Sequence, residues 1–233
     1  MRPVSRRGVP TELRAWKKSL DVSREFLSGV SLHAHTHHSR ESLSHLPHYI
    51  AQIPVVGTLF DRDLQHHQEQ SGTRVDFSKG WWHPPDSPRA VFDSEASQIT
   101  KMGLSPIVSV TDHDSIEAGL ELQRTFSPRC SPLSFEWTAP LGRGFLHLGI
   151  HNLPPASGHE WFNRLEAFTA DPQVEPLEDI LVDLTSADDI LVVLNHPMWD
   201  LAAVGAIAHQ HMLSQFLADY GHLMHALELN GYR

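Results

Sequence analysis

The sequence predicts an α/β protein in which strands alternate with helices. Two short runs of apolar and β-branched residues, 106–111 and 190–194, each follow a segment in which apolar residues recur at helical spacing. Both runs lead directly into polar clusters that contain a histidine, Asp112-His113-Asp114 and Asn195-His196-Pro197. In parallel α/β architectures, functional sites lie at the carboxyl ends of the strands, where loops converge. The two histidines are therefore candidates for one common site.

Length and composition fit one globular domain over residues 1–233. Hydrophobic residues make up 40% and charged residues 20% of the chain, which is enough for one sizeable core. The single cysteine, Cys130, excludes an internal disulfide framework and is compatible with a reducing cytoplasm. No stretch approaches the roughly 18 apolar residues of a membrane span. We therefore expect a cytoplasmic protein without a membrane partner.

The net charge of −10 bears on possible partners. After Arg143 the only basic residues are Arg164 and Arg233, whereas acidic residues continue through this half. Proteins that bind the phosphate backbone of nucleic acids rely on clustered Lys and Arg. The charge does not favour nucleic acid as a partner, although it does not exclude one.

The segment 30–36 is predicted to be the strand on which a metal site begins, after a helix over 11–27. Side chains alternate between the faces of a strand, so His33 and His35 point the same way. A neutral imidazole is the commonest metal ligand, and a pair at i and i+2 suits one cation near a strand end. A polar, solvent-exposed strand face is the alternative for an isolated pair. Histidines at later strand ends favour the metal site.

Residues 37–87 contain no long periodic element. Proline and glycine interrupt this stretch at Pro47, Pro54, Gly57, Gly72, Gly80, Pro84 and Pro85. Such a length is unusual for a simple connection. We expect a functional insertion that carries short helices and covers the site as a lid.

The next helix has clear start and stop signals. Ser87 is its expected N-cap, Pro88 its first residue, and Gly103 lies just past its end. Its buried stripe is expected to consist of Ala96, Ile99 and Met102.

His113 and Asp114, which follow the strand 106–111, have different explanations. Asp114 can cap the following helix, and Glu117 three residues later would complete a capping box. His113 has no such structural role, which makes it a candidate ligand.

Glu136 and His147 are predicted to meet on neighbouring strands. Apolar residues alternate along 133–138, which places Glu136 on the opposite face of a segment suited to burial. A buried carboxylate without partners is costly, so Glu136 should meet a cation, a metal or several donors. In 145–151, His147 and His151 share the face opposite to the apolar residues.

The C-terminal half continues the alternation. Helices are expected near 160–168 and 177–184, followed by 190–194 as a buried parallel strand. A helical region ending near Tyr220 leads to the last strand, 226–230. On that strand Glu228 and Asn230 share a face, whereas His209 and His211 in the preceding helix are interpreted as solvated surface residues.

The ordered series of motifs resembles the PHP family, the polymerase and histidinol phosphatase domains. The matching segments are His-Ala-His-Thr at 33–36, Thr-Asp-His-Asp at 111–114, Phe-Glu-Trp with the later His-Leu-Gly at 135–149, Asn-His-Pro at 195–197 and Glu-Leu-Asn at 228–230. Each segment alone is weakly specific, and it is their order along the chain that carries the resemblance.

The resemblance implies a distorted (β/α)7 TIM-like barrel whose C-terminal rim holds two or three divalent ions. The implied reaction is hydrolysis of a small phosphorylated substrate by a metal-activated water. We expect no covalent protein intermediate, because the sequence has no obvious nucleophile motif: Ser109 lies inside a strand without an elbow of glycines, and Cys130 has no adjacent base. Mixed histidine and carboxylate ligands suit Mn, Zn or Fe. The implied metal ligands are His33, His35, Glu41, His113, Glu136, His147 and His196. The implied catalytic residues are His113, Glu136 and His196.

The sequence departs from the family pattern at two places. The family usually has Asp or His five or six residues after its first motif, where this chain has Arg40 and Glu41. The family also closes its site with a Ser-Asp-x-His-like element after the Glu-Leu-Asn strand, whereas this sequence ends at Arg233. We expect a fragment whose barrel is incomplete at the C-terminus.

Two other functions remain open. Amidohydrolase-type enzymes also begin with His-x-His, but they often bridge two metals with a modified lysine, and no candidate strand carries a lysine. A non-catalytic PHP-like metal-binding module is the other alternative. The identity of the substrate and the oligomeric state do not follow from the sequence.

Overall fold

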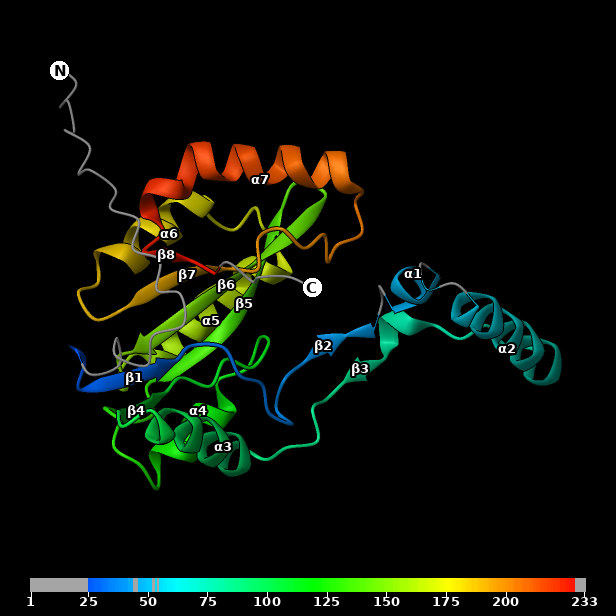
Figure 1. The fold of residues 1–233 in the computed structure, drawn as a ribbon. Coiled ribbons are helices and arrows are strands. Elements are labelled where there is room, and N and C mark those ends of the chain that lie inside the picture. Colours follow the sequence, from blue (N-terminus) through cyan, green and yellow to red (C-terminus); the bar gives the residue numbers. More distant parts are fainter. Residues whose placement is uncertain (1–24, 44–45, 52, 54, 229–233) are drawn as a thin grey trace, which may run out of the picture.

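The computed structural model describes residues 25–43, 46–51, 53 and 55–228, which form a mixed α/β fold (Figure 1). The strands are β1 (Ser28–Ser31), β2 (Glu41–Ser42), β3 (Trp81–Trp82), β4 (Ser105–Val108), β5 (Leu133–Leu141), β6 (Gly144–Leu153), β7 (Leu191–Asn195) and β8 (Ala226–Leu227). The α-helices are α1 (Leu46–Ala51), α2 (Val56–Ser71), α3 (Pro88–Lys101), α4 (Glu117–Gln123), α5 (Gly158–Ala170), α6 (Leu177–Ser186) and α7 (Ala206–Tyr220). Short 3-10 helices are η3 (Phe77–Lys79) and η4 (Gly221–Leu223). None of the helices in the described ranges is both long and apolar enough to cross a membrane.

The main sheet has the strand order β5-β6-β7-β8, and β1 pairs with β4 in parallel. An isolated parallel bridge between His113 and Glu136 connects the chain beyond β4 to β5. Within the described residues no ladder joins β8 to β1, and the expected TIM-like barrel, incomplete at its C-terminus, is not confirmed. The expectation of a parallel 190–194 strand was only half right. β7 is parallel to β8 but antiparallel to β6, because β5, β6 and β7 run in alternating directions.

Strands β5 and β6 separate an apolar face from a polar one. The apolar side chains expected on one face are buried against α5, α6 and α7; they include Leu133, Phe135, Trp137, Leu146, Leu148 and Ile150. Glu136, His147 and His151 point to the other face and are also buried. This alternation confirms the predicted faces of both strands and leaves the ionisable groups inside the protein.

A second apolar cluster holds α3 and α4 against β4. Ser87 caps α3 as expected, because its side chain accepts a hydrogen bond from the backbone N–H of Ala90. Ile99 is buried, as is Phe92, which the sequence interpretation did not include. The predicted burial of Met102 was wrong: its side chain is 53% exposed, because α3 ends at Lys101 and Met102 lies beyond it.

The insertion forms an arm that projects from the rest of the protein (Figure 1). β2 and β3 pair at its base, and α1 and α2 lie at its far end. Within the described part of the chain, Gly57 is the one buried residue of α2. The expected lid is therefore not seen, since α1 and α2 stand away from the sheets. The helix expected over 11–27 lies outside the described residues except for its last three, which are not α-helical.

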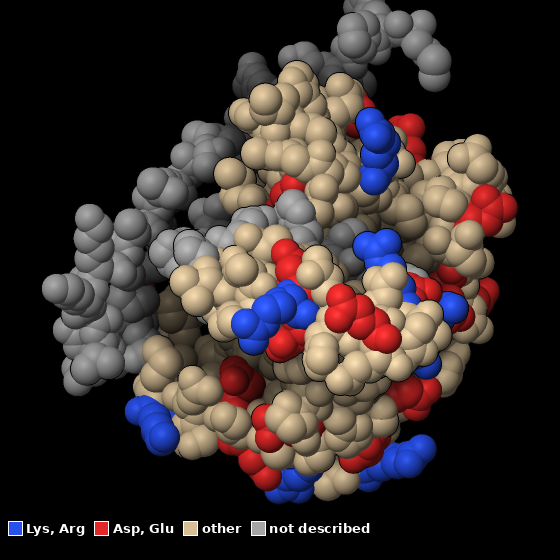
Figure 2. Space-filling view, turned by 90° about the vertical axis from the view of Figure 1, so that its right-hand side faces the viewer, with Lys and Arg blue, Asp and Glu red and all other residues tan. Residues whose placement is uncertain are grey.

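Surface charge is mixed on the face that Figure 2 shows. Lys and Arg side chains are scattered there among Asp and Glu side chains, and the described residues on this face form no continuous basic patch. A nucleic-acid backbone would require such a patch.

A chain of buried hydrogen bonds lies at one end of the polar face that β5 and β6 form. Ser134 donates to the carbonyl of Pro132 (3.3 Å) and accepts from the Ser109 hydroxyl (2.7 Å). Because Ser109 donates its hydroxyl hydrogen to Ser134, its oxygen acts as an acceptor towards Nδ1–H of His151, 2.7 Å away. Burial lowers the pKa of His151 to about 4, so the ring is neutral and its Nε2 is unprotonated.

Gly149 leaves room for this imidazole. A Cβ at Gly149 would lie 2.6 Å from Nε2 of His151 and 3.1 Å from Oδ1 of Asn195. Its backbone φ is not in the left-handed region, so glycine is needed here for space rather than for conformation.

We predict that Gly149→Ala lowers the free energy of unfolding by about 1–3 kcal/mol, the typical cost of overpacking. Gly221→Ala is the matched control, because an added Cβ there would have its nearest contact at 3.6 Å and φ is −57°. It should change stability by about 0.5 kcal/mol or less. Urea denaturation of both variants checks this, and equal stability of the two would contradict the steric explanation.

Candidate metal centre

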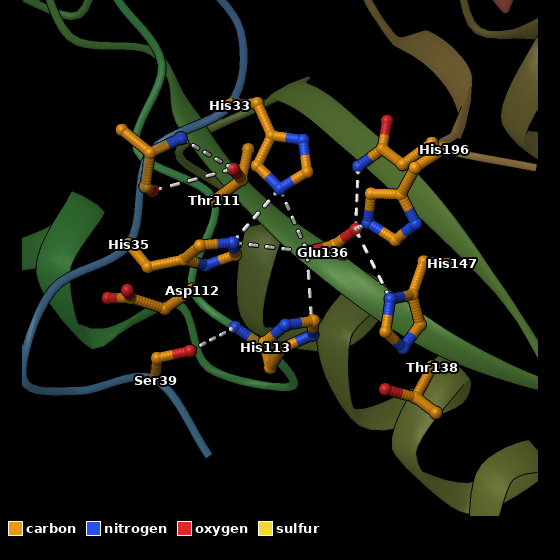
Figure 3. A network of polar contacts seen from close by, with 12 residues as sticks. His33, His35, Ser39, Thr111, Asp112, His113, Glu136, Thr138, His147 and His196 are labelled. Carbon is orange, nitrogen blue, oxygen red and sulfur yellow. Dashed lines mark hydrogen bonds and ion pairs between the residues drawn. The ribbon is translucent and has the colours of Figure 1, made fainter. Parts of the chain in front are cut away.

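Five imidazoles surround the carboxylate of Glu136 (Figure 3). Glu136 lies on β5 and is completely buried. Its Oε2 is 3.4 Å from Nε2 of His33, 3.5 Å from Nε2 of His35 and 3.4 Å from Nδ1 of His113. Its Oε1 is 3.1 Å from Nε2 of His196 and 3.5 Å from Nδ1 of His147. One carboxylate thus lies between two sets of histidines.

His33 and His35 come from the extended chain that follows β1. This segment continues alongside the chain after β4, since Thr111 donates its N–H to the carbonyl of Ala34 (2.8 Å) and accepts the N–H of Ala34 at its hydroxyl (3.2 Å). The two Nε2 atoms of His33 and His35 lie 2.9 Å apart. The i, i+2 spacing therefore brings both imidazoles to one point, as predicted.

His113 is held in place by backbone bonds to β5. Glu136 donates its N–H to the carbonyl of Asp112 (3.1 Å), and Asp114 donates its N–H to the carbonyl of Glu136 (2.9 Å). The N–H of His113 itself donates to the hydroxyl of Ser39 at 3.0 Å (Figure 3). These bonds fix the imidazole of His113 beside the carboxylate of Glu136.

The predicted capping role of Asp114 was wrong. α4 begins at Glu117 without a side-chain cap, and the carboxylate of Asp114 instead accepts the N–H of Thr138 (2.9 Å). Asp114 has φ 46°, a left-handed conformation that turns its side chain towards β5 instead of the helix.

Asp112 supports the site from behind and was not predicted as a supporting residue. It is buried, which raises the pKa of its carboxyl group, while hydrogen bonds from Thr36 favour the charged form. Thr36 donates both its backbone N–H and its hydroxyl to this carboxylate. Asp112 thereby ties the His33/His35 segment to the segment that carries His113.

His147 and His196 approach from β6 and from the end of β7. Asn195 donates Nδ2–H to Oε1 of Glu136 (2.9 Å), and His196 follows it with φ 27°, an uncommon backbone conformation. Glu228, just after β8, accepts the N–H of His196 (3.1 Å) and lies 3.0 Å from Nδ1 of His33. Glu228 therefore connects the C-terminal strand to the first one through the site.

Burial and charge divide the histidines into two kinds. Burial lowers the pKa of His35 and of His147 to about 3, so both are neutral and able to act as ligands. Burial also opposes protonation of His33, but the carboxylates of Glu136 and Glu228 outweigh it and raise the pKa to about 9. Burial opposes ionisation of Glu136, yet its contacts with His196 and His33 hold its pKa well below the usual value.

The donor set fits divalent metal ions. Oε2 of Glu136 and Nδ1 of His147, which both face the cluster, are buried without a hydrogen-bond partner. Metal–ligand bonds of about 2.1 Å at tetrahedral angles separate neighbouring ligand atoms by about 3.4 Å, close to the distances around Oε2. Four groups of described residues bring their ligand atoms within 4.8 Å of one another, and three of them belong to this cluster: His33-His35-Glu136, His113-Glu136-His147 and His33-His196-Glu228. The fourth, His37-His38-Glu121, includes exposed residues. A buried His/Glu cluster that could hold metal is thus present.

The structure brings together six of the seven residues implied as ligands. The exception is Glu41, which is exposed on β2 opposite Trp82 and belongs to none of the ligand groups found among the described residues. The structure places Glu41 apart from the cluster, because the chain has turned into the arm at β2. Glu228 takes part instead, and its position at a strand end on a shared face with Asn230 was the available signal. Asn230 lies outside the described residues.

Comparison with protein-family models and with curated proteins finds no match for this chain.

We predict that the protein retains divalent metal after incubation with Mn or Zn and dialysis. Replacing both His33 and His35 by Ala should remove part of the metal, because the buried group His113-Glu136-His147 stays intact. Glu136→Gln should remove more, because it takes the negative charge from both sets of histidines. Elemental analysis measures the content. A chelator should lower the unfolding temperature of the metal-loaded protein, since metal that binds the native state stabilises it.

Glu41→Ala is the matched control, and it should keep the metal content of the wild type. Metal absent from the wild type after reconstitution would contradict the assignment of the cluster. An equal loss in Glu41→Ala would show that the ligand groups are misassigned.

Proposed function

We propose that this chain is a metal-dependent phosphoesterase of the PHP type. The observation that carries the proposal is the shared carboxylate, because Glu136 lies between His33, His35 and His113 on one side and two further imidazoles on the other. Sites with adjacent ligand groups are typical of hydrolases that clamp a phosphate with two ions. The metals proposed are two or three ions of Mn, Zn or Fe.

Ions held here would lower the pKa of a coordinated water and neutralise charge on the substrate phosphate. The residues of the chain supply the positioning. Glu136 fixes the separation between the two histidine sets, while Asn195 orients its carboxylate through Oε1. Glu228 fixes the backbone of His196 and the ring of His33. Such bonds from outer residues typically contribute about 10- to 100-fold to metal affinity or activity.

The candidate nucleophiles on the chain support direct hydrolysis. Ser109 is completely buried, and its hydroxyl donates a hydrogen bond to Ser134. Cys130 is exposed on a loop before β5 and belongs to none of the ligand groups found among the described residues. A covalent phosphoenzyme therefore has no suitable nucleophile at either position.

The open strand order also supports a PHP-type barrel as the finer description of the fold. The neighbouring strands are, in order, β1, β4, β5, β6, β7 and β8, and the bridge between His113 and Glu136 joins the chain after β4 to β5. Glu228 contacts His33 between β8 and β1, where the described residues form no ladder. The amidohydrolase alternative gains no support, because the described lysines, Lys79 and Lys101, lie on η3 and α3.

We predict metal-dependent hydrolysis of at least one compound in a panel of phosphomonoesters and phosphodiesters. His196→Ala should lower kcat/KM by about 100-fold or more, because it removes a direct ligand rather than an outer partner. His211→Ala, an exposed histidine on α7, is the control and should keep wild-type activity. Inactivity of the metal-loaded wild type on the whole panel would favour the non-catalytic module.

The stereochemistry at phosphorus tests the absence of a covalent intermediate. A substrate made chiral at phosphorus should react with inversion, because one direct displacement inverts the centre. Retention would indicate two displacements, and with them a phosphoenzyme.

A further inference from the structure

Trp199 lies beside the metal cluster in the turn that follows β7. Its backbone N–H donates to the carbonyl of His196 (3.0 Å). Its indole stacks on the His196 imidazole, with the ring centroids 5.0 Å apart and the ring planes at 19° to each other. The side chain nevertheless remains 45% exposed, and the neighbouring Met198 is 77% exposed. Large aromatic side chains gain stability from burial, as Trp137 does in the core, so an exposed one at a site indicates a binding surface.

The turn that carries Trp199 is held rigidly. His209 is buried on α7 and donates a ring N–H to the carbonyl of Pro197 (2.8 Å), so its interpretation as a surface residue was wrong. The carboxylate of Asp200 accepts the N–H groups of Val204 (3.0 Å) and Gly205 (2.7 Å). A ring held in this way loses little conformational entropy when a ligand stacks on it.

The polar cluster itself offers little to the organic part of a substrate. The hydrogen-bond and ion-pair partners of Glu136 and its histidines among the described residues are other histidines, carboxylates, the Asn195 amide and the Ser39 hydroxyl, and none is a Lys or Arg side chain. Such groups suit metal and phosphate. Two aromatic rings also stack on these histidines: Phe145 on His147 and Trp199 on His196. An apolar planar group attached to the phosphate would find its contact area on the indole of Trp199.

We propose that Trp199 is a substrate-binding residue that selects phosphoesters in which a planar aromatic group adjoins the phosphate. This inference rests on the proposed function, since it places the phosphate at the metal cluster. The ring of the substrate stacks on the exposed part of the indole, while His196 stacks on the same side chain and fixes its orientation. Stacking of a planar ring on an aromatic side chain is strong enough to decide between ligands.

Equilibrium binding tests the inference without turnover. Phenylphosphonate and methylphosphonate share a phosphonate group and cannot be hydrolysed at an ester bond. Calorimetric titration of the metal-loaded protein should give about tenfold tighter binding of phenylphosphonate, the scale of one stacking interaction. Trp199→Leu should abolish this preference, and Trp199→Phe should retain most of it.

The paired variants separate stacking from simple loss of apolar area, because Leu is apolar but has no aromatic face. Metal content is measured in each variant, since Trp199 packs on His196, and the preference is compared only at equal metal content. Equal affinity of the wild type for both phosphonates would overturn the role of Trp199 and leave the phosphoesterase proposal standing. No binding of either phosphonate would overturn both.

Discussion

The buried carboxylate of Glu136 is the constraint on which the rest of the structure depends. A carboxylate removed from water is stable only where cations or donors surround it. Here the compensation comes from separate segments: the chain after β1, the chain after β4, β6, and the chain after β7. Movement of any one of these segments would remove part of this compensation. The site and the neighbouring strand order are therefore maintained by the same interactions.

The two faces of β5 and β6 explain how a polar cluster can exist inside so small a fold. Side chains on the outward face supply the apolar area that stabilises the sheet against α5, α6 and α7. The inward face can then carry Glu136, His147 and His151 at the expense of that stability. A slip of one residue in the register would exchange the two faces. The apolar core thus specifies the register, and the register positions the ligands.

Sequence patterns predicted those parts of the site that depend on local geometry. The two-residue period of an extended chain predicts that His33 and His35 share a face, although β1 ends at Ser31 and both histidines lie beyond it. The same period predicts the inward faces of Glu136 and His147, and the pairing of β5 with β6 brings these two together. Glu41 was assigned from the family's spacing after the first motif, and such a spacing does not show that the chain leaves the site here along the β2–β3 pair. Strand direction has the same limitation. An apolar run such as 190–194 shows burial on both faces but does not distinguish parallel from antiparallel neighbours.

Glu228 shows why the electrostatic role of a residue can escape a sequence pattern. It is the carboxylate that places His33 between two negative charges, and His33 is the imidazole whose pKa rises to about 9. In protein free of metal, a proton on His33 balances part of the charge of Glu136 and Glu228 at neutral pH. A cation that takes the same nitrogen must release that proton, because a ligand imidazole is neutral. The acidic pair therefore favours positive charge at this end of the cluster, first as a proton and then as a metal ion.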